Sequence, residues 1–280
     1  MNNKRSCLAV YSAILFISTL TFGQSVGPAI RISVDSGRPL ADALSQLETQ
    51  VGVAINYEDV LYYYAPATDD VASTVVTANQ RVVPKGGPLS FTYTRPPLAN
   101  TLSIAPIVGA LVEVSNSMDY TGAYEKSTVG GSLFVAPSQT RNVTGAFVPT
   151  TRPLDILVTL PFQERTAAET LDLILSQVSQ GGKVQVAQGT VPFMMMATSK
   201  VLMVADKEPA RSVLGRMFYL LASGPMADGS TVPRIGYQLL CDHISHNCAL
   251  NIHIVGSTDA RTAVPLSGSI LAGWSPRKTN

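Results

Sequence analysis

The stretch that most constrains the fold is residues 38–57, where a short amphipathic helix is expected to run directly into a strand. Apolar residues recur at helical spacing over residues 40–51, and Gly52 follows where a left-handed residue commonly ends a helix. Residues 53–57 then alternate between apolar and small or polar side chains, which is the period of a strand with one buried face. Residues 30–34 alternate in the same way. The predicted local order is therefore strand, helix, strand.

The same stretch resembles a known family. Its hydrophobic strand at residues 30–34, the PLADAL segment at residues 39–44 and the TQVGVAINY segment at residues 49–57 are similar to the STN domain, the short N-terminal module of secretins and TonB-dependent receptors. That module is an interaction domain, so the resemblance implies protein binding and carries over no catalytic residue. Secretins and TonB-dependent receptors continue into further domains and a membrane barrel, whereas this sequence ends at Asn280. The resemblance therefore implies a free-standing member of the family.

Residues 1–23 have the pattern of a secretory signal peptide. Lys4 and Arg5 precede a long uncharged apolar run, and Thr21 and Gly23 are small enough for the −3 and −1 positions of a cleavage site. We expect cleavage after Gly23 and a periplasmic or secreted mature protein. The alternative is an uncleaved anchor helix, since the apolar run is long for a signal and short for a membrane span. No later stretch approaches the length of a membrane helix, so no membrane span is expected after cleavage.

The composition favours a turn-rich, strand-rich exported protein over a helical bundle, because only 14% of residues are charged while the chain holds 21 Gly and 18 Pro. Losing Lys4 and Arg5 with the signal moves the formal net charge from +1 to −1. That balance gives no reason to expect binding to nucleic acid or to an anionic membrane surface. The sequence also lacks the serine-hydrolase, phosphate-loop, dinucleotide and zinc-protease motifs, so neither a cofactor nor an enzymatic activity is predicted.

Two halves of the mature chain are expected to share one order of elements, strand–helix–strand–strand–helix–strand–strand, which indicates a duplication. The predicted fold class is α+β, with tandem small mixed sheets and helices packed on one face. We place an STN-like domain at residues 24–137, a linker at 138–151, a second domain at 152–256 and a flexible tail at 257–280. Each domain would then carry its own core. The alternative is one continuous sheet without a repeat.

Local patterns place the remaining elements. In the first half, a strand is predicted at residues 89–93, a helix at 104–114 and a hairpin of strands 124–128 and 132–136 around a Gly-Gly turn. In the second half, Thr166 and Glu169 have capping-box spacing at the start of a helix. The other elements expected there are a helix over residues 209–221 and strands at 154–160, 183–187, 201–205, 235–241 and 249–255.

Two further features bear on chemistry. Glu58 and Asp59 are adjacent carboxylates, and neighbours in an extended strand point to opposite sides, so they are not predicted to form an acid–base dyad. We interpret them as solvated loop charges, together with Asp69 and Asp70. The three methionines at residues 194–196 could line a hydrophobic groove, because methionine is soft and adaptable, but core filling is favoured.

One cluster gathers both cysteines of the mature chain and its three histidines within residues 241–253. Cys241 and Cys248 bracket a predicted hairpin turn, and an exported chain with two cysteines usually oxidises them, so a disulfide between them is favoured. Two alternatives stay open. Cys241, His243, His246 and Cys248 could hold a tetrahedral zinc ion, or the thiols could be free. With the disulfide formed, the histidines would be exposed turn residues.

The sequence therefore predicts a non-enzymatic periplasmic or secreted interaction module of the bacterial envelope, as the STN resemblance implies. Its partner would be another envelope protein, bound by adding a strand to an exposed sheet edge. The alternative function is a small metal-binding protein built on the cluster around Cys241 and Cys248.

Overall fold

A computed structural model of the chain describes residues 27–63, 68–70, 82–96, 99–118, 122–223, 234–242 and 247–256. The predicted signal peptide at residues 1–23 and the predicted tail at 257–280 lie outside the described residues. Among the helices described, none is both long and apolar enough to cross a membrane. Helices and strands are mixed along the described chain, and the predicted α+β class is confirmed.

The first half contains the elements expected from its sequence. Its helices are α1 (Pro39–Val51) and α2 (Thr101–Asn116). Its strands are β1 (Ala29–Ser36), β2 (Ile55–Glu58), β3 (Thr68–Asp70), β4 (Val82–Pro84), β5 (Gly87–Thr94), β6 (Gly122–Val129), β7 (Ser132–Arg141) and β8 (Phe147–Pro149). Helix α1 ends where Gly52 takes a left-handed conformation with φ of 65°, as predicted. Helix α2 begins with a capping box between Asn100 and Ser103 and continues through Pro106.

The second half begins with a short 3-10 turn, η3 (Pro153–Asp155), so its first strand starts later than residue 154 and extends further than predicted. Its other elements are β9 (Leu157–Thr166), α3 (Ala167–Gly181), β10 (Gln185–Gln188), α4 (Phe193–Thr198), β11 (Lys200–Pro209), α5 (Ala210–Ser223), β12 (Arg234–Asp242) and β13 (Asn247–Val255). The capping box of Thr166 and Glu169 opens α3 as predicted. Helix α4 carries residues 194–196, of which Met196 is buried as core filling requires and Met194 is exposed.

The two halves repeat one pairing pattern. If the short strands β3, β4 and β8 are set aside, the first and third strands of each half form a separate antiparallel ribbon, β1 with β5 and β9 with β11. The short second strand pairs in parallel with the last one, β2 with β7 and β10 with β13. The last two strands form an antiparallel hairpin, β6 with β7 and β12 with β13. The predicted common order of elements is therefore matched by a common order of strand pairs.

The halves differ from two tandem domains in one respect, because their sheets are joined. Strand β12 pairs in parallel with β2, Gln238 lying opposite Tyr57 and Leu239 opposite Glu58. The result is a seven-stranded sheet in the order β10-β13-β12-β2-β7-β6, with β8 paired to β7. Within the predicted linker at residues 138–151, β7 runs to Arg141 and β8 adds three residues to the same sheet. A continuous sheet and a repeat therefore coexist.

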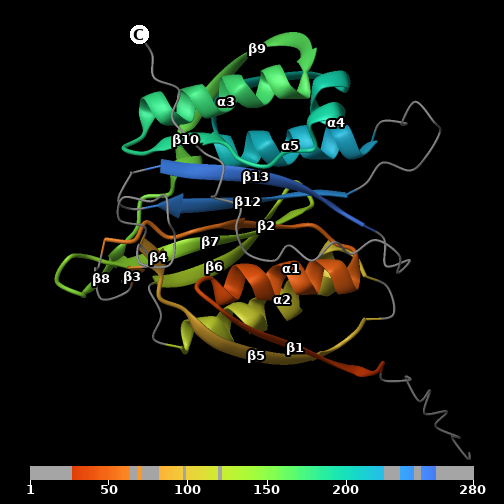
Figure 1. The fold of residues 1–280 in the computed structure, drawn as a ribbon. Coiled ribbons are helices and arrows are strands. Elements are labelled where there is room, and N and C mark those ends of the chain that lie inside the picture. The colour runs from red at the N-terminus through yellow and green to blue at the C-terminus, as the bar shows by residue number, and fades with distance from the viewer. Residues whose placement is uncertain are drawn as a thin grey trace, which may run out of the picture.

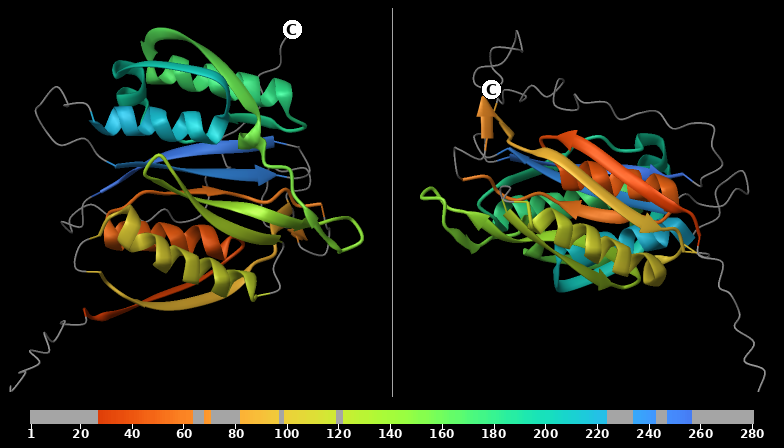
Figure 2. Two further views of the ribbon diagram at one scale, coloured as in Figure 1. Left: turned by 180° about the vertical axis from the view of Figure 1, so that it is seen from behind. Right: turned by 90° about the horizontal axis from the view of Figure 1, so that it is seen from below.

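The parallel junction inverts one half relative to the other. Strand β6 runs antiparallel to β2 through β7, whereas its counterpart β12 runs parallel to β2. The second half must therefore be turned over within the shared sheet, which places its helices on the opposite face. Figure 1 shows this arrangement, with α3 and α5 on one side of the sheet and α1 and α2 on the other. The β1–β5 ribbon lies outside α1 and α2, and β9 lies outside α3, as the left view in Figure 2 also shows.

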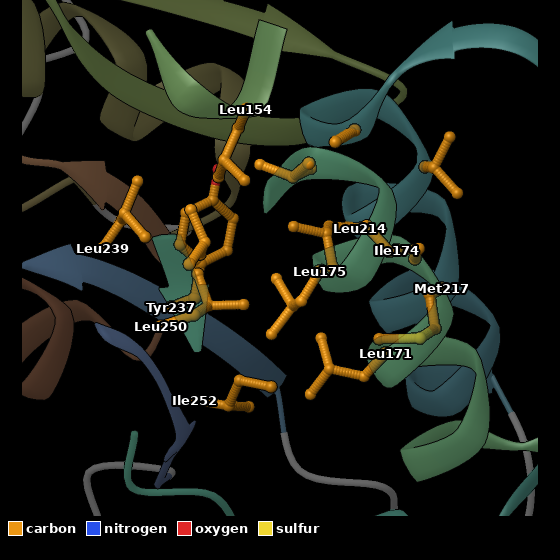
Figure 3. Packing of buried hydrophobic residues seen from close by; sticks show 14 of the residues in the cluster. Leu154, Leu171, Ile174, Leu175, Leu214, Met217, Tyr237, Leu239, Leu250 and Ile252 are labelled. Carbon is orange, nitrogen blue, oxygen red and sulfur yellow. The ribbon is translucent and has the colours of Figure 1, made fainter. Parts of the chain in front are cut away.

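Each face of the sheet has its own hydrophobic cluster, and the two clusters interlock. Figure 3 shows members of the cluster beneath α3 and α5, among them Leu171, Leu214 and Tyr237. That cluster also contains Leu61 and Phe134 from the first half. Gly215 of α5 makes room for Phe134, because a Cβ at this glycine would lie 3.0 Å from the ring. In return, Leu240 of β12 packs against the cluster of the first half. The core of each half is thus completed by the other.

Candidate functional site

The junction between the two halves contains the main cluster of buried charge. Glu58 and Asp59 lie at the end of β2 with only 1% and 0% of their surface exposed. The interpretation of both as solvated loop charges is therefore wrong. They do point to opposite sides, as predicted, because Glu58 bonds to α5 of the second half and Asp59 bonds to Arg38 beside α1. The reason for burial is that β2, an edge strand of its own half, becomes central once β12 pairs with it.

Glu58 forms a forked ion pair with Arg211 of α5. The Arg211 Nη2 donates to Glu58 Oε2 at 2.8 Å, and Nε donates to Oε1 at 2.5 Å. The Tyr237 hydroxyl donates to the same Oε1 at 2.9 Å, and Asp155 accepts from Arg211 Nη1. Burial lowers the pKa of Arg211, but the bonds to Glu58 outweigh burial and raise the pKa above its ordinary value. The pair therefore ties β2 to α5 across the junction.

Asp59 forms the second network, on the opposite face. Its Oδ2 accepts from Arg38 Nε at 2.7 Å and from the Cys241 backbone N–H at 3.3 Å. Its Oδ1 accepts from the hydroxyls of Tyr62, at 2.6 Å, and Tyr57, at 3.0 Å. Arg38 Nη2 in turn donates to the Cys241 carbonyl at 3.0 Å. One carboxylate and one arginine thus clamp both backbone groups of Cys241 and hold β12 in register.

Three tyrosines close this network. The Tyr57 and Tyr124 hydroxyls lie 2.8 Å apart, and their rings stack with centroids separated by 5.6 Å. Burial and the neighbouring Asp59 raise the pKa of Tyr57 and Tyr62 well above the ordinary value, so both phenols stay protonated and donate. A pocket of about 20 Å³ lies beside them, lined also by Lys85, and has room for a water molecule.

A third contact, between Glu48 of α1 and His253 of β13, crosses the junction further along the sheet. The His253 Nε2 lies 3.0 Å from Glu48 Oε2, and Glu48 Oε1 accepts the Ile55 N–H at 2.6 Å. Burial lowers the pKa of His253, but the adjacent Glu48 carboxylate raises the pKa by a larger amount. The pKa of His253 therefore lies above its ordinary value of 6.5. Gly236 leaves space for the pair, since a Cβ there would lie 2.9 Å from the imidazole nitrogen.

Cys241 and Cys248 are joined by a disulfide, the pairing that the sequence favours. They are direct partners in the β12–β13 hairpin, and their Cα atoms lie 4.1 Å apart. His243 and His246, the other members of the zinc alternative, lie outside the described residues. No group of metal-ligating side chains occurs among the residues that are described. In the oxidised state both sulfurs are bonded to each other, so neither is a thiolate ligand.

What the junction can do chemically is hold two inverted halves together. Within the described ranges, every buried side-chain nitrogen or oxygen has a hydrogen-bond partner. Glu58 and Asp59 each face an arginine and at least one tyrosine hydroxyl, so their lone pairs are used in fixing β2. The arrangement is typical of a structural polar network, in which each buried charge is paired and further hydrogen-bonded.

Exposed large apolar side chains lie away from the junction, and the second half carries two groups of them, on α4 and on its outer ribbon. Phe193 and Met194 of α4 are 66% and 71% exposed, although both are large apolar residues. On the outer ribbon, Phe162 of β9 and Leu202 and Val204 of β11 also face solvent. Outward positions of the β1–β5 ribbon carry instead the polar residues Arg31, Ser33, Ser90 and Thr92. The repeat thus provides an internal comparison, because the outward face is apolar on the β9–β11 ribbon and polar on the β1–β5 ribbon.

Several open strand edges are occupied by side chains. The Gln177 amide bonds both backbone groups of Thr159 in β9, at 2.8 and 2.9 Å. The Asn116 amide does the same for Tyr124 in β6, with both bonds at 2.9 Å. The Ser179 hydroxyl bonds both backbone groups of Val186 in β10. These contacts protect the edges that a partner strand would otherwise pair with.

Sequence reasoning missed the residues that complete the junction. Arg38 immediately precedes α1, and nothing in its local sequence pattern indicates Asp59 as its partner. Arg211 falls between buried positions of α5. This position is the sequence signal that could have indicated a buried ion pair, because a charge that faces the core requires a partner. Comparisons with protein-family models, with curated proteins and with solved structures find no match to this chain. The STN resemblance therefore stays a prediction.

Proposed function

We propose that this chain is a non-enzymatic, exported interaction module of the bacterial envelope, whose partner is another envelope protein. The observation that carries the proposal is α4, where Phe193 and Met194 are held on a short helix with two thirds or more of their surface in water. The counterpart segment of the first half, between β2 and β5, has no such helix among its described residues. An insertion that exposes two large apolar side chains has no folding benefit and favours a binding role.

Three features support the exported, binding-type assignment. The STN resemblance implies an interaction domain, and the pattern of residues 1–23 favours export. The disulfide between Cys241 and Cys248 is typical of oxidising compartments. The capped edges favour docking onto side chains over strand addition at Thr159, Tyr124 and Val186. Methionine suits such a surface, because its flexible thioether adapts to the shape of a partner.

The test is cross-linking in the native envelope followed by capture of the tagged full chain. We expect the double variant Phe193→Ser/Met194→Ser to lose the cross-linked partner that wild type retains. Leu102→Ser is the matched control, since Leu102 is at least as exposed as the two α4 residues but lies on α2 of the first half. Equal recovery of the partner by wild type and the α4 variant would disprove the role of α4. Circular dichroism of both variants establishes that they are folded.

A further inference from the structure

The outer face of β11 carries a row of four exposed side chains, Lys200, Leu202, Val204 and Asp206. The side chains between them, Val201, Met203 and Ala205, are buried against the helices, so exposed and buried positions alternate from Lys200 to Asp206 although the pairing with β9 shifts after Met203 and again after Ala205. The row therefore begins with a positive side chain, continues with two apolar side chains and ends with a negative one. It extends over about 20 Å of strand, at about 3.3 Å per residue.

Strand β9 widens the apolar centre of this row. Gln163 lies opposite Met203 and Leu160 lies opposite Ala205, so Pro161 and Phe162 together occupy the irregular stretch beside Val204. Phe162 is 70% exposed, and Leu202 is 53% exposed. Phe162, Leu202 and Val204 thus form one small apolar face with charged residues at both ends. We call it the ribbon face.

The fold itself does not require an apolar ribbon face. The β1–β5 ribbon has the same pairing and the same position outside its helices. Its outward side chains are polar, and Arg31 Nε donates to Ser90 Oγ at 3.0 Å across the two strands. Since the same architecture is stable with a polar surface, the apolar residues of the second ribbon point to contact with another molecule.

We propose that the ribbon face is a self-association surface, on which two copies of this chain pack ribbon against ribbon about a two-fold axis. The order of charges argues for a second copy. A two-fold axis between Leu202 and Val204 places Lys200 of each copy against Asp206 of the other and Leu202 against Val204. The same patch is then complementary to itself, which is the requirement of an isologous interface. Lys200 already binds Glu164 at 3.0 Å and would bridge two carboxylates.

The size of the face sets the strength of the association. A two-stranded ribbon ten residues long offers a footprint of about 300 Å², using strand spacing of about 4.8 Å and a rise of about 3.3 Å. A stable interface buries about 800 Å² per partner. We therefore expect a weak, reversible dimer that forms as concentration rises, with charge order giving specificity more than affinity.

Sedimentation equilibrium of the full mature chain over a wide concentration range tests the proposal. Wild type is expected to shift from monomer to dimer, and Leu202→Asp is expected to weaken the dimer at least about tenfold, a change of about 1.4 kcal/mol. Leu102→Asp, on the exposed face of α2, is the control and should dimerise as wild type does. A monomer at every concentration, or a dimer unaffected by Leu202→Asp, overturns the proposal.

A charge exchange tests the axis itself. Asp206→Lys places like charges opposite each other and should weaken the dimer. The triple variant Lys200→Asp/Glu164→Lys/Asp206→Lys reverses every charge of the row and should restore it. Failure of the triple variant to restore association, in a protein that circular dichroism shows to be folded, contradicts the two-fold arrangement. These variants leave α4 untouched, so loss of the dimer and loss of the envelope partner are separate results.

Discussion

At the scale of single residues, two adjacent carboxylates serve two networks. Because side chains alternate across a strand, Glu58 enters the core of the second half while Asp59 enters that of the first. A buried charge is costly unless it is paired and hydrogen-bonded. Arg211 and Arg38 provide the pairing, and each network also reaches across the junction, through Arg211 itself or through the backbone of Cys241. The short strand β2 is therefore fixed from both faces.

Removing one partner should cost more than removing both. Arg211→Leu leaves Glu58 buried without its cation, and we expect a loss of about 3–5 kcal/mol in the free energy of unfolding, because an uncompensated buried charge remains. The double variant Glu58→Leu/Arg211→Leu removes the charge as well and should recover much of that loss. Urea unfolding at neutral pH measures both. If the double variant is less stable than Arg211→Leu, the ion pair is not the source of the effect.

The Glu48–His253 pair predicts a pH dependence of stability. Since the folded protein holds the pKa of His253 above 6.5, the pair contributes fully below that unfolded value and its contribution is lost as pH rises through the folded pKa. The difference in unfolding free energy between wild type and His253→Gln should therefore be largest in mild acid and shrink towards alkaline pH. His243 and His246 are present in both proteins, so their titration cancels. A constant difference across this range would contradict the assignment.

These residue contacts show where sequence reasoning reaches its limit. That Glu58 and Asp59 diverge follows from strand geometry alone and could be predicted. That both are buried could not, because it depends on β12 pairing with β2 across some 180 residues of chain. The disulfide is an intermediate case. Compartment and spacing favoured the bond between Cys241 and Cys248, while nothing local indicated that Asp59 binds the Cys241 backbone.

At the scale of elements, side chains from helices form hydrogen bonds with the exposed backbone edges of strands. Gln177 and Ser179 project from α3 to β9 and β10, and Asn116 at the end of α2 reaches β6. In each case one side chain satisfies both the N–H and the C=O of a strand residue. Such occupancy is a general protection against edge-to-edge pairing. It allows an exposed ribbon such as β9–β11 to present its face without extending into a sheet with other chains.

Loss of an edge contact should be local and measurable. Gln177→Ala frees both backbone groups of Thr159, so we expect faster hydrogen exchange at the Thr159 N–H and a loss of about 0.5–1.5 kcal/mol in stability. Gln180→Ala is the matched control, because it makes the same change on the same helix and, among the described residues, its amide bonds to Ser176 and not to β9. Similar exchange at Thr159 in wild type and both variants would show that the contact does not protect the edge.

Elements with strong periodicity were predictable, and those set by tertiary contacts were not. Gly52 and the box of Thr166 and Glu169 mark helix ends by local chemistry, so α1 and α3 follow from sequence. Helix α4 was missed because its methionines have no polar periodicity and two of them, Met195 and Met196, pack on the core while Met194 does not. The continuation of β7 to Arg141 was missed because its pairing with β8 replaces the expected linker.

At the scale of the whole molecule, the two repeats are joined because non-equivalent edge strands of their sheets pair with each other. The edge of β12 meets the edge of β2, and the second half is turned over, so helices cover both faces of one sheet. Contacts of both kinds cross the junction of β12 with β2. Phe134 and Leu240 extend the hydrophobic clusters across it, and Glu58 forms an ion pair with Arg211 across it. The boundary near residue 151 is therefore a boundary of the repeat, and a few side chains extend each hydrophobic cluster across it.

This interlocking predicts how a divided chain behaves. The fragment of residues 152–256 contains every strand of its own repeat, but it exposes the β12 edge, leaves Arg211 without Glu58 and loses Phe134 and Leu61 from its core. We expect the fragment to be unfolded or strongly destabilised by circular dichroism and urea titration, while the full mature chain is folded. Co-expression with the fragment of residues 24–151 should restore a folded complex, because the junction is then available. A fragment 152–256 that unfolds cooperatively and as late as the full chain would instead establish two independent domains, each stable without the shared sheet.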